Sequence, residues 1–89
     1  NALYPHKELL CVCREGVPED LKSNQALMLY HEISILVKTA ENAANLAELA
    51  PFTAAYPIPS KGCLYYLCEQ NACKPPVNKI SQLLHIILN

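Results

Sequence analysis

Three short apolar runs, each bounded by charged or turn-forming residues, limit what this chain can fold into. Residues 9–13 are continuously apolar with charges on both sides, which is typical of a strand buried on both faces. The β-branched run 33–39 and the run 63–68 have the same character. The sequence therefore predicts three buried strands.

Segments with helical signals lie between and after these runs. Pro18 and the two carboxylates after it predict a helix over residues 18–30, because proline fits the first turn and negative charge there favours the helix dipole. Residues 41–50 carry an apolar stripe at helical spacing, and Pro51 limits that helix. Asn78 is a good N-cap for a last helix with a strong apolar stripe.

The alternation of strands and helices predicts a three-layer α/β fold, βαβαβα, with a small three-stranded parallel sheet and right-handed crossovers. If the strands lay in chain order, both crossover helices would cover one face and leave apolar strands bare on the other. The order 2-1-3 places these helices on opposite faces and the first strand in the centre. We therefore expect a Rossmann-like half with strand order 2-1-3.

Such a sheet has one natural binding position, the crevice beyond the carboxyl ends of the strands where strand order reverses. In the predicted fold that point lies between the first and third strands. Residues that follow these two strands are expected to line the crevice: Arg14, Glu15 and Gly16 on one side, and Glu69, Gln70 and Asn71 with Cys68 and Cys73 on the other.

The stretch CEQNAC, residues 68–73, has a local geometry of its own. If a two-residue turn follows Glu69, Cys68 faces Cys73 at a non-hydrogen-bonded site, where a disulfide is able to close. A reversible thiol pair and a metal site are both open, but the spacing departs from the C-x-x-C of thioredoxin-type motifs and zinc knuckles. Two small side chains that finish a strand and a turn are the favoured interpretation.

Two further cysteines, Cys11 and Cys13, alternate onto the same face of the first strand. A metal site with Cys68 and Cys73 as further ligands is one interpretation of this pair. A central strand gives a cation no access from solvent, however, so core packing is favoured. Cys63 receives the same interpretation. The sequence lacks glycine-rich phosphate motifs and a nucleophile elbow, so no catalytic residue, metal or cofactor is assigned and no reaction is named.

Composition bears on partners and location. The net charge is -1 and the seven basic residues are scattered, which argues against nucleic-acid and membrane partners. The chain is 52% hydrophobic and 17% charged, so part of its surface is expected to face another domain. An odd number of cysteines, five, favours reduced thiols and an intracellular, cytoplasmic location over secretion.

The stretch YLCEQNACKPPV, with LAELAPFTAAYPIPSKG before it, resembles the carboxyl-terminal end of the thioredoxin-domain-containing proteins related to spermatogenesis-associated protein 20. The positions that carry the resemblance are Tyr66, Leu67, Cys68, Glu69, Cys73 and Pro76. The resemblance covers most of the chain, although Cys63 and Leu64 depart from the family pattern. It implies a longer protein with an amino-terminal thioredoxin-like domain and a helical barrel similar to sugar-epimerase barrels, in a family whose activity is poorly defined.

Residues 1–89 are accordingly expected to be a single small α/β domain at the carboxyl terminus of a longer, multidomain chain. The expected function is that of a non-catalytic accessory domain whose partners are the thioredoxin-like domain and helical barrel of its own chain. The alternative is a thiol-disulfide redox or metal-binding site at Cys68 and Cys73 that serves the thioredoxin-like domain.

Overall fold

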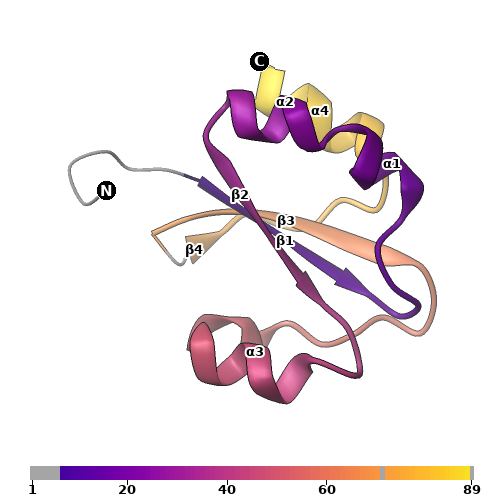
Figure 1. Ribbon diagram of the computed structural model, residues 1–89, viewed down its shortest axis with the longest axis vertical. Coiled ribbons are helices and arrows are strands. Elements are labelled where there is room, and N and C mark those ends of the chain that lie inside the picture. Colours follow the sequence, from indigo (N-terminus) through magenta and orange to yellow (C-terminus); the bar gives the residue numbers. More distant parts are fainter. Residues whose placement is uncertain (1–6, 71, 89) are drawn as a thin grey trace.

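A four-stranded mixed sheet lies between two layers of helices (Figure 1). The computed structural model describes residues 7–70 and 72–88. The strand order is β2-β1-β3-β4. The strands are β1 Lys7–Cys13, β2 Ile33–Lys38, β3 Cys63–Glu69 and β4 Ala72–Cys73.

Short helices cover both faces of the sheet. One face carries α1 Glu19–Ser23, α2 Gln25–Tyr30 and α4 Ile80–Leu88, and the other carries α3 Ala43–Leu49 with the 3-10 turn η1 Pro51–Ala55 (Figure 1). The helix predicted over residues 18–30 is divided at Asn24, whose side-chain amide donates to the Asp20 carbonyl oxygen at 2.8 Å and so competes with helical bonding. Among the described residues, no helix combines the length and apolar character needed to cross a bilayer.

The prediction of an all-parallel, three-stranded sheet is wrong. β1 and β2 are parallel, but β3 is antiparallel to β1, so that Lys7 lies opposite Glu69 and Cys13 lies opposite Cys63. β1 lies between β2 and β3, and β4 adds a fourth strand beyond β3. The Rossmann-like half is therefore not formed.

The direction of β3 follows from the path of the chain before it. After α3 and η1, residues 57–62 run back to the carboxyl end of β1, where β3 begins (Figure 1). The Arg14 N–H donates to the Gly62 carbonyl oxygen at 3.1 Å and joins the two strand ends. Gly62 has a φ of 70°, a left-handed conformation that glycine adopts without side-chain strain.

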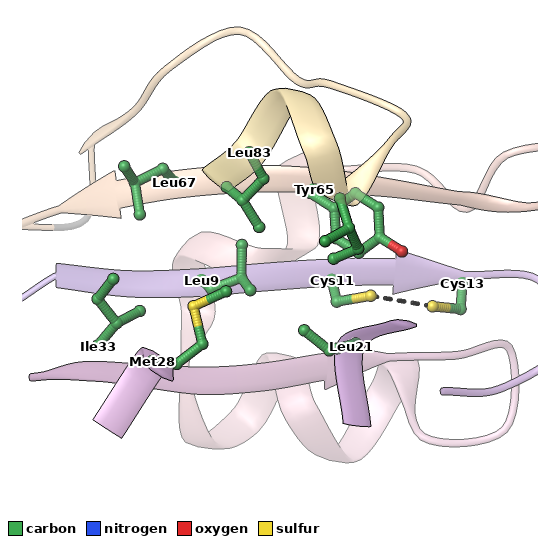
Figure 2. Packing of buried hydrophobic residues seen from close by; sticks show 10 residues of the cluster. Leu9, Cys11, Cys13, Leu21, Met28, Ile33, Tyr65, Leu67 and Leu83 are labelled. Atoms are coloured by element: carbon green, nitrogen blue, oxygen red, sulfur yellow. Dashed lines mark hydrogen bonds between the residues drawn. The ribbon is translucent and has the colours of Figure 1, made fainter. Parts of the chain in front are cut away.

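The core is centred on β1, because every residue from Leu9 to Cys13 has an exposed fraction of 0%. Alternation along the strand divides these residues between two faces. The face toward α1, α2 and α4 holds Leu9, Cys11, Cys13, Leu21, Met28, Ile33, Tyr65, Leu67, Ile80 and Leu83 (Figure 2). The face toward α3 holds Leu10, Val12, Tyr66 and Cys68. Full burial of one such side chain contributes roughly 1.5–3 kcal/mol, so β1 is fixed from both sides.

The connection from β2 to α3 is fixed by Lys38, the last residue of β2. Its exposed fraction is 6%, and its Nζ donates to the carbonyl oxygens of Thr53 at 2.8 Å and Tyr56 at 2.7 Å. Asn42 adds a local bond, since its Nδ2 donates to the Val37 carbonyl oxygen at 2.7 Å. These bonds hold η1 against the sheet and fix the point from which the chain turns back toward β3.

Candidate functional site: two groups of cysteines

The first group is the pair Cys68 and Cys73, which a disulfide joins across the β3–β4 hairpin. The two residues face each other with Cα atoms 3.9 Å apart, and Glu69 faces Ala72. The Lys74 N–H donates to the Leu67 carbonyl oxygen at 3.0 Å, which makes the cysteine pair the adjacent non-hydrogen-bonded site. The predicted facing of Cys68 and Cys73 is confirmed, whereas the expectation of reduced thiols is wrong for this pair. Gln70 has a φ of 54°, and Asn71 lies outside the described residues.

A hollow of about 270 Å³ lies beside this disulfide. Its lining consists of Lys7, Leu67, Cys68, Glu69, Ala72, Cys73 and Lys74. Cys68 is 1% exposed, whereas Cys73 is half-buried and lies nearer to solvent. Cys73 is therefore the residue of the pair that is more open to an external thiolate.

The predicted crevice is not formed, because its two sides lie at opposite ends of β1. Arg14, Glu15 and Gly16 follow the carboxyl end of β1, whereas Glu69 is paired with Lys7 at the amino end. The bend at residues 14–16 instead lies beside the start of β3, where Arg14 Nε donates to the Pro59 carbonyl oxygen at 2.9 Å. Antiparallel β3 is the physical reason, since it carries Cys68 and Gln70 away from this bend.

The second group consists of Cys11, Cys13 and Cys63, which we call the three-thiol cluster. Its three sulfurs lie within 4.8 Å of one another. The Sγ atom of Cys13 is 3.1 Å from that of Cys11 and 2.7 Å from that of Cys63. Figure 2 shows Cys11 and Cys13 pointing to the same side of β1. All three thiols are free, and the cluster lies on the face covered by α1, α2 and α4.

Backbone pairing explains why these sulfurs meet. Cys11 and Cys13 are two residues apart on one strand, so their side chains share a face. Cys63 is directly opposite Cys13, and the bond from the Arg14 N–H to the Gly62 carbonyl makes Cys13 and Cys63 a non-hydrogen-bonded pair. Side chains approach most closely at such a pair.

Burial keeps the thiols of Cys11 and Cys63 protonated at neutral pH. Desolvation, followed by the hydrogen bond with Cys13, raises the pKa of Cys11 far above its usual value. The same two causes raise the pKa of Cys63 to about 12. Desolvation also raises the pKa of Tyr65, which lies beside the cluster. Cys11 and Cys63 are therefore weak nucleophiles at neutral pH, because the thiolate is the reactive form.

The sequence interpretation missed this cluster because it assigned Cys63 to core packing and paired Cys11 and Cys13 with the wrong partners. The structure brings Cys63 to them and leaves Cys68 and Cys73 at the far end of β3. A usable signal lies in the two glycines, since Gly16 closely follows Cys13 and Gly62 directly precedes Cys63. Two apolar runs that meet turns at their cysteine ends fit an antiparallel pair.

Comparisons with known proteins add no residue to either group. No family model, curated protein or solved structure matches the chain. The geometry of the two cysteine groups and the character of the exposed surface are the features that indicate a function.

Proposed function

We propose that this chain is a non-catalytic accessory domain that packs on other domains of a longer thioredoxin-domain-containing polypeptide. The observation that carries the proposal is the apolar edge of the sheet at β2, which no other described strand covers. β2 is the outer strand on that side, and a hollow of about 370 Å³ beside it is lined by Gln25, Leu29, Ile33, Ser34 and Ile35. Leu29 and Tyr30, at the end of α2, are 77% and 81% exposed.

An open apolar edge of this kind is a liability unless something covers it. The unpaired N–H and C=O groups of an edge strand are a template for another strand, and soluble proteins usually protect such edges with charges, proline or a covering element. Within β2 the only charged residue is Lys38, whose side chain turns inward to Thr53 and Tyr56. The edge thus has the character of a surface that is covered in the complete protein.

The occupant that we propose is an extended segment of the same polypeptide, added beside β2 with an apolar side chain in the hollow next to Leu29. Strand addition supplies main-chain hydrogen bonds, and the hollow supplies a position for one alternate side chain. The composition supports an internal partner, since 52% hydrophobic and 17% charged residues leave an apolar surplus for so small a domain. The resemblance to the thioredoxin-domain-containing family supports a longer chain.

Two matched substitutions in the natural polypeptide test this function. Leu29→Glu introduces a charge at the proposed contact, whereas Leu49→Glu changes an equally exposed leucine, 85% exposed, on α3 at the opposite face. Hydrogen exchange of the β2 amides is the measurement. Leu29→Glu should accelerate this exchange at least about tenfold, which corresponds to about 1.4 kcal/mol, and Leu49→Glu should leave it unchanged.

The isolated 89-residue chain provides the second control. Its β2 amides should exchange as fast as those of the Leu29→Glu polypeptide, because the covering segment is absent. Equal protection of β2 in the isolated chain and in the natural polypeptide would contradict the proposal.

A second candidate function, a reversible disulfide at Cys68 and Cys73, is favoured by the half-buried residue Cys73 at the hollow lined by Lys7 and Lys74. A thiolate of a dithiol donor attacks the Cys73 sulfur and Cys68 leaves as thiolate. The donor's second thiolate then attacks the donor sulfur of this mixed disulfide, so that the donor disulfide forms and Cys73 leaves as thiolate. The donor is oxidised by two electrons and the pair is reduced by two. We retain only this redox form of the alternative, since sulfurs joined in a disulfide are not thiolate ligands.

Serine substitutions separate the two functions, and thiol titration identifies the cysteines that reductant releases. A redox role predicts that reductant adds two reactive thiols, confined to Cys68 and Cys73, and that Cys68→Ser and Cys73→Ser abolish the activity of the natural polypeptide. Full activity of both serine variants would leave the pair as a structural crosslink of an accessory domain.

A further inference from the structure

We propose that the three-thiol cluster of Cys11, Cys13 and Cys63 is a binding site for a divalent, thiophilic metal ion, of which Zn²⁺ is the common biological example. The site is separate from the β2 edge and from the hairpin disulfide, so it does not rest on either proposed function. Three observations carry it: the spacing of the sulfurs, the backbone that fixes them, and the access through Cys63.

The spacing of the sulfurs is close to that of a metal-thiolate site. Zinc binds thiolate sulfur at about 2.3 Å, so the sulfurs of a tetrahedral site lie about 3.8 Å apart. The cluster holds two sulfur-sulfur distances of 2.7 and 3.1 Å, and all its sulfurs lie within 4.8 Å of one another. An ion therefore requires Cys13 and Cys63 to spread by about 1 Å, which small rotations of the two side chains supply.

The backbone fixes the three ligands without any further folding step. Cys11 and Cys13 have exposed fractions of 0% on the central strand, and Cys63 is held opposite Cys13 by the β1–β3 pairing. Sites on strands hold their ligands more precisely than sites on loops. The cluster is therefore preorganised as a triangle of soft ligands, which favours zinc-like ions over the hard cations that prefer oxygen.

Access to the cluster is through its third member. Cys63 is only half-buried, and its Sγ lies 4.0 Å from the Gly16 carbonyl oxygen at the bend over the end of β1. An ion is able to meet Cys63 first and then the two buried thiols. The fourth coordination position would point toward this open side, where a water molecule completes a three-ligand zinc site.

Charge favours a divalent ion over a monovalent one at this cluster. Binding follows M²⁺ + 3 RSH → [M(SR)₃]⁻ + 3 H⁺, with the three protons released to solvent and no change in oxidation state. A monovalent ion such as Cu⁺ would leave a charge of −2 on the same three thiolates, and buried charge is costly. The divalent complex has a charge of −1, so its desolvation on the apolar face of the sheet costs less free energy.

Cadmium titration tests the site, because Cd²⁺ is a zinc-like ion whose thiolate complexes absorb in the ultraviolet. The starting protein is the Cys68→Ala/Cys73→Ala variant in a phosphine reductant, where the remaining three of the five cysteines are those of the cluster. We expect thiolate-to-cadmium absorption that saturates at one ion per chain and is reversed by a strong metal chelator. Adding Cys63→Ser should weaken binding at least about tenfold, or about 1.4 kcal/mol.

Circular dichroism verifies that each variant is folded. Should Cys63→Ser fail to fold, alkylation of the starting variant replaces it: bound Zn²⁺ should slow the labelling of Cys63 at least about tenfold, by the same thiolate occupancy. The proposal is overturned if excess Cd²⁺ gives no thiolate absorption, or if folded Cys63→Ser binds as tightly as its parent. It is also overturned if Zn²⁺ leaves alkylation unchanged, or if the reduced chain takes no ion and oxidised glutathione instead yields a Cys13–Cys63 disulfide.

Discussion

The two groups of cysteines occupy the same kind of backbone position and yet hold different sulfur chemistry. Cys68–Cys73 and Cys13–Cys63 are both non-hydrogen-bonded cross-strand pairs. The first is disulfide-bonded with a sequence separation of 5, and the second is unbonded with a separation of 50. Cys11 accompanies the second pair at 3.1 Å, whereas the first pair stands alone.

Strand pairing brings the cysteines of both groups together, but the number of sulfurs determines whether a group is suited to a disulfide or to a metal ion. Two isolated sulfurs across a hairpin suit a covalent bond that closes a short loop. Three sulfurs from two strands form a triangle that suits an ion. The two groups also lie on opposite faces of the sheet, since Cys68 belongs to the α3 face and the three-thiol cluster to the other.

The largest effect should come from the hairpin. Reduction of Cys68–Cys73 should lower the free energy of unfolding by about 2 kcal/mol, because a bond that closes so short a loop removes that much chain entropy from the unfolded state. For a domain of this size the midpoint of thermal unfolding should fall by about 10 °C. Circular dichroism melts with and without a phosphine reductant measure it.

The control for this experiment is the Cys68→Ala/Cys73→Ala variant, whose midpoint should not respond to reductant. A reductant-dependent shift that persists in this variant would break the comparison, since it would mean that Cys13 and Cys63 are the bonded pair.

A smaller effect should separate the two groups at alkaline pH. The pKa of Cys63 is raised from 9.0 to about 12, whereas disulfide-bonded cysteines do not titrate. A thiol with a raised pKa in the folded state contributes stability that is complete below pH 9.0 and is lost as pH rises through about 12. Because Cys63 is partly solvated, the free energy of unfolding should fall by less than about 1 kcal/mol at one pH unit above the ordinary pKa of this thiol.

Denaturant titrations of the Cys68→Ala/Cys73→Ala variant, below and above pH 9.0, measure this loss without thiol-disulfide exchange. Adding Cys63→Ser should flatten the dependence on pH, although Tyr65 still contributes through its own raised pKa. If Cys63→Ser leaves the dependence of the unfolding free energy on pH unchanged, the titration of Cys63 does not contribute to this dependence.

The smallest effect concerns the turns beside the two groups. Near the three-thiol cluster the residues with positive φ are Gly16 and Gly62, whereas at the hairpin it is Gln70, with φ 54°. Gln70→Gly should stabilise the chain by a few tenths of a kcal/mol, since relief of the left-handed conformation slightly exceeds the added freedom of the unfolded chain. Gln70→Ala should not increase the stability of the chain. Equal stability of the Gln70→Gly and Gln70→Ala variants in denaturant titrations would show that the left-handed conformation of Gln70 is not strained.

Local pattern predicted the parts of the fold that depend on local physics. The apolar run of β1 predicted a strand buried on both faces, and every residue from Leu9 to Cys13 is buried. The hairpin prediction was correct because turn geometry alone places Cys68 opposite Cys73. The last helix also formed, as α4, with Ile80 and Leu83 buried as its stripe required.

The direction of β3 was beyond local pattern. A helix followed by a proline-rich connection is able to lead into a strand of either direction, and the outcome depends on bonds between distant residues, such as those of Lys38 to η1. The error in direction then moved every expectation that relied on it. Cys63, which was predicted to be a core residue, is a member of the three-thiol cluster. Arg14–Gly16, which were predicted to lie beside the hairpin, lie at the opposite end of β1.

The pairing of β1 with β3 also has a consequence for synthesis on the ribosome. Leu9 pairs with Leu67, and Cys13 pairs with Cys63. Most of the chain must therefore leave the exit tunnel before β3 is able to pair with the central strand β1. A nascent chain that pauses after α3 holds the edge of its most apolar strand unpaired. Chaperone contact at that stage, or slow translation before residue 63, would therefore have its greatest influence on the yield of folded protein.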